Sequence, residues 1–336
     1  MMSIPFNRFK KKSLILVYKI YPEDMNEILN DIRYKKLFQC ILKESHSTFE
    51  EKTLIDCSSQ IYYVIKMNST QIISKSNENS LRIWDLYSGK CIKIIYNYFE
   101  NNYGAKEAKI VKINKTTIAF RYDFIDIILL DITTGKCLYT LCSENTIWFL
   151  FKYNKNQLLS ATWDFTIRIW DLASRECLTT VLKTTNNIII SIVSETQLVL
   201  GRKNDYTIQI WDLLTEDIFK TLKGHTNKVK NVIKLSNTQI ASASADKSIN
   251  IWDYTTGMLL KTLFGHTGEV NDIVKITKTQ IASCSSDKSI KIWDFTSRNC
   301  LKTLIGHTYS VENIIKITKF QIVSASKDHS IRIWDL

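Results

Sequence analysis

The dipeptide Trp-Asp recurs through this 336-residue chain at a nearly constant interval. It occurs at 84–85, 170–171, 211–212, 252–253, 293–294 and 334–335, and Leu130-Asp131 holds the same place in a weaker copy. The successive spacings are 46, 40, 41, 41, 41 and 41 residues. A fixed period of this size indicates repeated units that bury their apolar faces against one another. We therefore divide residues 48–336 into seven repeats.

Each repeat contains four short runs of β-branched and other apolar residues, separated by polar turns. In the last repeat, Ile331 and Ile333 alternate with Arg332, which is the period of two expected of a strand. Runs this short and this regular predict antiparallel strands, and they exclude helices from the repeats.

A unit of about 41 residues with Gly-His early and Trp-Asp late resembles the WD40 repeat family. Gly-His occurs at 224–225, 265–266 and 306–307. The resemblance covers residues 48–336 and implies an all-β fold, a seven-bladed β-propeller with one four-stranded sheet per blade. The segment 52–55 repeats 302–305 residue for residue, Lys-Thr-Leu-Ile in both. In the family such a strand completes the last blade, so we expect residues near 49–56 to close the ring and cover an open edge.

In the family, the His of Gly-His joins a buried hydrogen-bond network with a Ser, an Asp and the Trp. The matching sets here are His225, Ser242, Asp246 and Trp252; His266, Ser283, Asp287 and Trp293; and His307, Ser324, Asp328 and Trp334. A Ser, a His and an Asp together also suggest a hydrolase triad. Three copies at a fixed period are unlike one active site, and there is no Gly-x-Ser-x-Gly elbow. We predict structural networks, no catalytic residue and no enzyme.

The networks weaken toward the N-terminus. The fourth repeat has Gly201 at the place of the Ser, and the third has Ser143 at the place of the His. The second repeat has Phe120 and Leu130 in place of Ser and Trp.

Composition fits a globular protein, with 45% apolar and 23% charged residues. Of the eight cysteines, four share the position seven residues after the Trp position, which predicts small buried side chains: Cys91, Cys137, Cys177 and Cys300. No Cys-x-x-Cys or His-x-x-x-His pair indicates a metal site, and no glycine-rich phosphate loop indicates a nucleotide cofactor. No apolar run approaches the length of a membrane span. We expect a cytoplasmic protein without metal or cofactor, with the nucleus as the alternative location.

The net charge of +12 also follows the repeat. Two sets of lysines recur at fixed positions, Lys220, Lys261 and Lys302, and Lys234, Lys275 and Lys316. We interpret them as protection of outer strand edges. A nucleic-acid surface more typically gathers its cations on one face with interleaved aromatic residues, so the pattern argues against nucleic acid as partner. An acidic protein partner is the milder inference.

Family members bind partner proteins mostly through loops on one face, so we expect a non-catalytic interaction scaffold, a monomeric propeller within a complex. The extra length in the 46-residue spacing predicts an unusual loop at about 97–107. The residues expected to contact a partner are Tyr98, Phe99, Tyr103, Trp163, Arg202, Tyr309 and Lys327. The alternative for the aromatic residues of this set is that they cover the irregular second repeat.

Residues 1–47 lie outside the repeat. Pro22 begins a segment with helical spacing of apolar residues that extends to Glu44. The start of this helix is faintly similar to an F-box and to the tail of a BTB domain. This similarity implies the alternative function, a ubiquitin-ligase adaptor that docks the ligase through the N-terminal helix.

Overall fold

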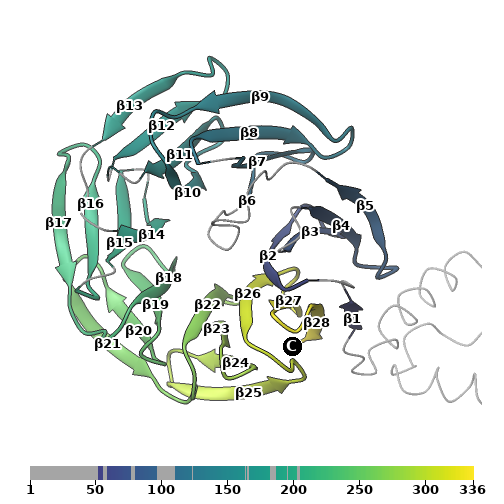
Figure 1. Ribbon diagram of the computed structural model, residues 1–336. Helices are drawn as coiled ribbons and strands as arrows, with labels where there is room; N and C mark the ends of the chain where they lie inside the picture. Colours follow the sequence, from purple (N-terminus) through teal and green to yellow (C-terminus); the bar gives the residue numbers. More distant parts are fainter. Residues whose placement is uncertain are drawn as a thin grey trace, which may run out of the picture. The chain divides into compact units, whose positions relative to one another are not determined.

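The computed structural model describes residues 52–55, 59–76, 80–96, 110–122, 124–162, 164, 166–181, 187–194, 196–202 and 205–336. These residues contain 28 β-strands and no helix. Hydrogen bonds group the strands into seven antiparallel four-stranded sheets. The sheets stand around a central axis as blades 1 to 7 (Figure 1), which confirms the predicted propeller. The expected N-terminal helix lies outside the described residues.

Each blade runs from an innermost strand beside the axis to an outermost strand at the rim. Blade 1 contains β2 (Ile61–Lys66), β3 (Gln71–Ser76), β4 (Leu81–Asp85) and β5 (Cys91–Ile95). Blade 2 contains β6 (Ile110–Lys112), β7 (Thr117–Arg121), β8 (Asp126–Asp131) and β9 (Lys136–Cys142). Blade 3 contains β10 (Ile147–Lys152), β11 (Gln157–Thr162), β12 (Ile167–Asp171) and β13 (Cys177–Val181). Blade 4 contains β14 (Asn187–Ile192), β15 (Gln197–Arg202), β16 (Ile208–Asp212) and β17 (Asp217–Leu222).

The last three blades follow the same plan. Blade 5 contains β18 (Val229–Lys234), β19 (Gln239–Ser244), β20 (Ile249–Asp253) and β21 (Met258–Leu263). Blade 6 contains β22 (Val270–Lys275), β23 (Gln280–Ser285), β24 (Ser289–Asp294) and β25 (Asn299–Ile305). Blade 7 contains β26 (Val311–Lys316), β27 (Gln321–Ser326) and β28 (Ser330–Asp335), with β1 (Lys52–Ile55) as its outermost strand.

The outermost strand of blade 7 comes from the other end of the propeller sequence. β1 pairs antiparallel with β28, and Leu54 lies opposite Ile331 in the register. The side chain of Leu54 is buried in an apolar cluster with Ile331, Ile333 and Trp84. Because Trp84 belongs to blade 1, this cluster joins the first blade to the last. β1 therefore covers the edge of β28 that would otherwise be open to another strand.

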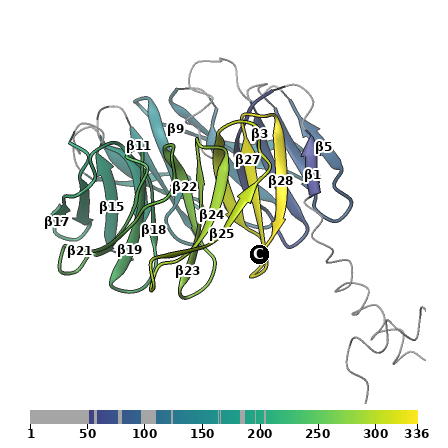
Figure 2. The same ribbon diagram turned by 90° about the horizontal axis from the view of Figure 1, so that it is seen from below.

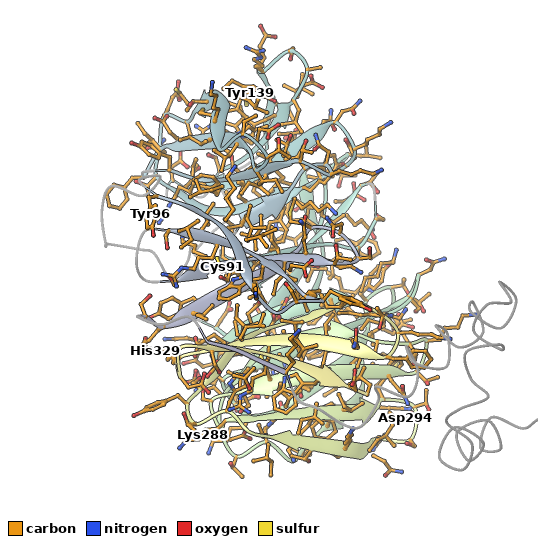
Figure 3. All side chains as sticks on the ribbon, turned by 90° about the vertical axis from the view of Figure 1, so that its right-hand side faces the viewer. Cys91, Tyr96, Tyr139, Lys288, Asp294 and His329 are labelled. Carbon is orange, nitrogen blue, oxygen red and sulfur yellow. The ribbon has the colours of Figure 1, made fainter. Side chains whose placement is uncertain are left out.

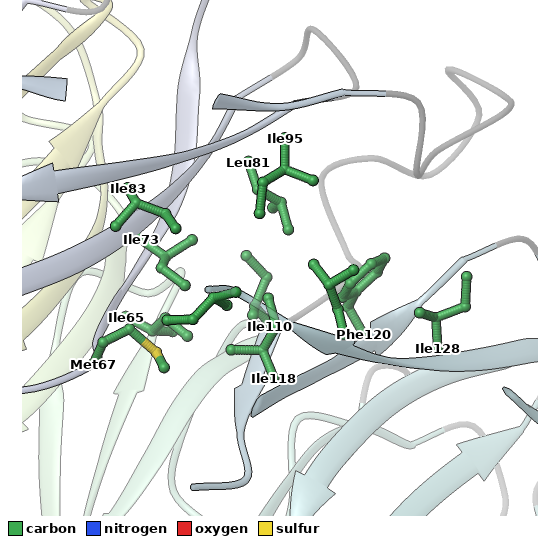
Figure 4. Close-up of a cluster of buried hydrophobic side chains, with 12 residues drawn as sticks. Ile65, Met67, Ile73, Leu81, Ile83, Ile95, Ile110, Ile118, Phe120 and Ile128 are labelled. Atoms are coloured by element: carbon green, nitrogen blue, oxygen red, sulfur yellow. The ribbon is translucent and has the colours of Figure 1, made fainter. Parts of the chain in front are cut away.

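The hydrophobic core is divided into layers between neighbouring blades. One layer (Figure 4) joins β3 and β4 of blade 1 to β6, β7 and β8 of blade 2. Phe120 and Leu130, which replace the Ser and Trp of the repeat, are both fully buried in this layer. Blade 2 thus replaces a polar network with apolar packing, which needs no hydrogen-bond partner.

The expectation of buried cysteines at the shared repeat position is wrong. Cys137, Cys177 and Cys300 are exposed, and Cys91 is half-buried. Apolar residues at the same position are also open to solvent, including Ile218 and Leu259. The physical reason is that the position lies at the start of the outermost strand, at the rim of the propeller, where solvent reaches the side chain. In β25, only Leu304 near the end of the strand is buried.

The interpretation of the recurring lysines also needs correction. Lys220, on an outermost strand, donates through Nζ to the carbonyls of Thr255 and Thr256 in the next blade, at 2.9 and 3.1 Å. Lys302 donates likewise to Asp335 at 3.1 Å. These lysines bridge blades as well as facing solvent. The second set is not on outer edges at all, because Lys234, Lys275 and Lys316 end innermost strands.

Candidate interaction surface

Blades 5, 6 and 7 each contain a chain of hydrogen bonds that runs from Trp through Ser and His to Asp. In blade 5, Trp252 Nε1 donates to Ser242 Oγ over 2.7 Å. The same oxygen lies 2.7 Å from His225 Nε2, and His225 Nδ1 lies 2.7 Å from Asp246 Oδ2. The ionised carboxylate of Asp246 can only accept, so Nδ1 of His225 carries the hydrogen. In the neutral imidazole Nε2 then accepts from the Ser242 hydroxyl, whose oxygen accepts the indole N–H.

The other two predicted sets are assembled in the same way. In blade 6, the distances from His266 to Asp287 and to Ser283 are both 2.7 Å. In blade 7, the distances from His307 to Asp328 and Ser324 are also 2.7 Å. Trp293 and Trp334 donate to the two Ser hydroxyls at 2.7 and 2.8 Å.

These networks have the geometry of a hydrolase triad but lack its access. The oxygen of a nucleophilic Ser must reach a substrate. Ser242, Ser283 and Ser324 are each 0% exposed, and each hydroxyl already accepts the Trp N–H. The three sets therefore satisfy buried polar groups, and their Ser residues cannot act as nucleophiles in this fold.

The carboxylates in the networks are held in their charged form. Burial alone would raise the pKa of Asp246, but hydrogen bonds from His225 and Ser248 outweigh this and hold the pKa well below its usual range. The pKa values of Asp287 and Asp328 are lowered for the same reasons. The networks therefore depend on three ionised aspartates.

Each of these carboxylates also connects two segments of the same face. Asp246 Oδ2 accepts a hydrogen bond from the backbone N–H of Thr226, at 3.0 Å, in the loop that enters blade 5. Asp246 Oδ1 accepts another from the N–H of Ser248, at 3.0 Å, in the turn between β19 and β20. We call the side of blades 5 to 7 that carries these loops (223–228, 264–269 and 306–310) and turns (245–247, 286–288 and 327–329) the loop face.

The remaining blades retain only parts of the network. Trp84 and Trp170 donate to Ser74 and Ser160, both at 2.8 Å. Trp211 Nε1 has no hydrogen-bond partner in the described part of blade 4, because Gly201 stands where blades 1, 3, 5, 6 and 7 have Ser.

Four segments of the chain, 135–171, 217–253, 257–294 and 298–335, match the family model described as WD domain, G-beta repeat. Each segment contains the outermost strand of one blade and the three inner strands of the next, and these next blades are 3, 5, 6 and 7. The chain is a WD40 repeat protein. The best-matched blades of this WD40 propeller include the three that carry complete networks.

Two known proteins are similar to this chain, one in sequence and one in structure. Autophagy-related protein 16 of Arabidopsis thaliana is 27% identical over 126 residues, which is 37% of this chain and 24% of that protein. The match therefore spans about a quarter of that relative. The crystal structure of the WD40 β-propeller domain of Doa1 has a TM-score of 0.70 at 19% identity, covering 86% of this chain and 97% of that one. At this sequence identity, the likeness to the Doa1 domain shows a shared fold alone.

Two of the residues predicted to contact a partner have described side chains, and both lie on the loop face. Tyr309 is 63% exposed, and Lys288 Nζ lies 5.9 Å from the centre of its ring. Lys327 pairs with Glu312 at 2.9 Å. Arg202 is the last residue of β15, but its side chain lies outside the described part. Tyr98, Phe99, Tyr103 and Trp163 also lie outside it and stay predictions.

Sequence reasoning missed one set of residues on this face. Lys247, Lys288 and His329 each follow the network Asp in the turn, and each is exposed. Their φ angles of 71°, 72° and 68° are in the left-handed region that favours glycine. In Figure 3, which views the ring from its rim, Lys288 and His329 lie on one face and Asp294 lies on the other. The available signal was a polar residue with a long or aromatic side chain, recurring where a turn would ordinarily take Gly or Asn.

The described residues also bear on other kinds of site. No group of His, Cys, Asp and Glu among them is arranged to hold a metal ion. No helix among them is long and apolar enough to cross a membrane.

Proposed function

We propose that this protein is a non-catalytic protein-interaction scaffold whose partner binds the loop face of blades 5 to 7. WD40 propellers act in general through protein partners, which supports the class of function. The single observation that carries the choice of face is the set of three buried networks. Each ties a loop and a turn to the interior of its blade, so side chains on these segments are held ready before binding.

A second set of contacts holds blade 6 against blade 7 at the loop face. Asn271 Nδ2, in blade 6, donates to Ser310 Oγ at 3.1 Å and to the carbonyl of Val311 at 2.8 Å, both in blade 7. A surface held in this way loses little conformational entropy on binding, which favours affinity.

The chemistry of the loop face favours an acidic segment with an apolar or aromatic residue. Lys247, Lys288 and His329 supply cationic or titratable groups at equivalent points of three blades. Tyr309 supplies an exposed ring beside Lys288, and an exposed aromatic residue is typical of a binding hot spot. Positive side chains steer an acidic partner toward such a surface.

The test is affinity purification of the full chain from its native host cell, with quantitative mass spectrometry of the bound proteins. The variant is Lys288→Ala with Tyr309→Ala. A matched control exists on the opposite face, where Lys319 Nζ lies 4.5 Å from the ring centre of Phe320, which is 60% exposed. The control variant is therefore Lys319→Ala with Phe320→Ala, which removes one cation and one exposed ring from the other side.

We expect at least one bound protein to fall about tenfold with the loop-face variant and to change less than about twofold with the control. The proposal is wrong if the two variants lose the same proteins to the same degree. The ubiquitin-ligase alternative rests on the segment 22–44, which lies outside the described residues, and it stays a prediction.

A further inference from the structure

A ring of lysines lies at one end of the central axis of the propeller. The innermost strands β2, β6, β10, β14, β18, β22 and β26 surround the axis (Figure 1). Six of these seven strands end in a lysine, and only β14, with Ile192, does not. We call these six residues the lysine ring: Lys66, Lys112, Lys152, Lys234, Lys275 and Lys316. Figure 2 shows the blades from the side. In blades 5 to 7 each innermost strand follows a loop of the loop face, so its last residue lies on the opposite face, and the repeated topology places the other three lysines there too.

Each ammonium of the lysine ring is held by the preceding blade. Lys234 Nζ, of blade 5, donates to the carbonyl of Val193 in blade 4 at 2.5 Å. The acceptor is in every case the residue just beyond the innermost strand of the preceding blade. The other five acceptors are the carbonyls of Ile317, Met67, Ile113, Leu235 and Ile276. These contacts fix the positions of the cations around the axis.

The charge of the lysine ring has no local counter-charge. Among the described residues, no carboxylate lies within 4.0 Å of any of the six ammonium groups, whereas Lys230 and Lys327 on the loop face both have such partners. Three neighbours in the ring also act on one another. Burial lowers the pKa of Lys112, and the charges of Lys152 and Lys66 lower it further. The carbonyl uses one N–H of each ammonium, and an ammonium has three.

We propose that the lysine ring binds a compact polyphosphate, a small molecule that carries several phosphate groups on different sides. Phosphate oxygens accept strong charge-assisted hydrogen bonds from lysine, and several of them would neutralise the uncompensated cations. Six cations arranged about one axis match a ligand with charge on all sides. An extended nucleic acid follows a groove and would contact only an arc of the ring. The source is either a free polyphosphate or the headgroup of a phosphorylated lipid.

The probe is inositol hexakisphosphate, titrated calorimetrically into the full chain. The variant changes three members of the lysine ring, Lys234→Gln, Lys275→Gln and Lys316→Gln. The matched control changes three outermost-strand lysines, Lys220→Gln, Lys261→Gln and Lys302→Gln. Both variants lose three positive charges, and both lose lysines that donate to a backbone carbonyl of a neighbouring blade.

We expect saturable 1:1 binding, weakened at least about tenfold by the ring variant and less than about threefold by the control. Absence of saturable binding, or an equal loss in both variants, overturns the proposal. If the ring variant does not fold, Ile192→Lys gives a second test, because it adds the missing seventh cation and leaves the others in place. It should tighten binding about threefold, and an unchanged affinity would count against the ring.

Two further measurements identify the ligand class. Flotation with vesicles containing a phosphorylated inositol lipid would support the lipid headgroup as the source, and calorimetric binding without flotation would support a free polyphosphate. A single-stranded oligonucleotide that competes as well as the probe at equal total charge would overturn the assignment to a compact ligand.

Discussion

At the scale of single residues, one hydroxyl decides whether the indole N–H of a buried Trp has a hydrogen-bond acceptor. Trp293 Nε1 has Ser283 as acceptor, whereas Trp211 Nε1 has no partner in the described part of blade 4, where Gly201 holds the equivalent position. Gly201→Ser should therefore stabilise the propeller by about 1 kcal/mol, through a new hydrogen bond and a less flexible unfolded chain. Urea denaturation measures the change in the free energy of unfolding.

The reverse substitution provides the control for this prediction. Ser283→Gly removes the acceptor of Trp293 and the partner of His266 Nε2, and both groups stay buried. The cost should be about 2–4 kcal/mol, since two buried polar groups lose their partner. If the two substitutions changed the free energy of unfolding by similar small amounts, the network would not be a source of stability.

The network aspartates make stability depend on pH. The pKa of Asp287 is depressed in the folded protein, so the unfolded chain binds a proton at this group more readily. The stabilisation is therefore complete above the ordinary pKa of about 4 and is lost as the pH falls below it. We expect the Tm to fall steadily from pH 5 to pH 2. The triple variant with Asn at 246, 287 and 328 should start from a lower Tm and show a shallower slope, whereas parallel slopes would contradict this origin.

At the scale of secondary structure, closure of the ring depends on one four-residue strand. Leu54 of β1 is 2% exposed, whereas its neighbour Thr53 faces solvent. Leu54→Asp puts a charge into the cluster between blades 7 and 1, so β1 should leave and expose the edge of β28. We expect a Tm at least about 5 °C lower and higher oligomers in size-exclusion chromatography. Thr53→Asp adds the same charge outside the cluster and should leave the protein monomeric.

The same elements show how far the sequence could predict the structure. The period of the Trp-Asp pairs was enough for seven blades, because six units bury their Trp and the second buries Leu130 at the same position. The period did not predict that Cys300 is exposed or that Lys234 lies at the end of an innermost strand. A repeat position shows which residues are equivalent, but not whether the next blade covers them or which end of the axis they reach. Lys288 was missed because its left-handed conformation is one that favours glycine, so the residue type did not indicate the place that it takes in the turn.

At the scale of the whole molecule, the two faces of the propeller are built differently. On the loop face, buried carboxylates order loops and turns, and two of the cations there, Lys230 and Lys327, pair with Glu269 and Glu312. On the opposite face, the partners of the lysine ring among the described residues are backbone carbonyls. One protein could therefore bind a polypeptide and a polyphosphate at the same time, because the two surfaces lie at opposite ends of the axis.

The unequal distribution of networks predicts unequal local stability around the ring. Blades 5 to 7 have complete networks, whereas in blade 4 the Trp N–H lacks an acceptor and in blade 2 the network is replaced by apolar packing. We expect native-state hydrogen exchange to be slower in β19, β23 and β27 than in β7 and β15, by about tenfold or more. Equal protection in all second strands would mean that the ring opens only as one cooperative unit, and that the networks add no local rigidity. Slower exchange confined to blades 5 to 7 would show that the proposed binding surface is the most rigid part of the molecule.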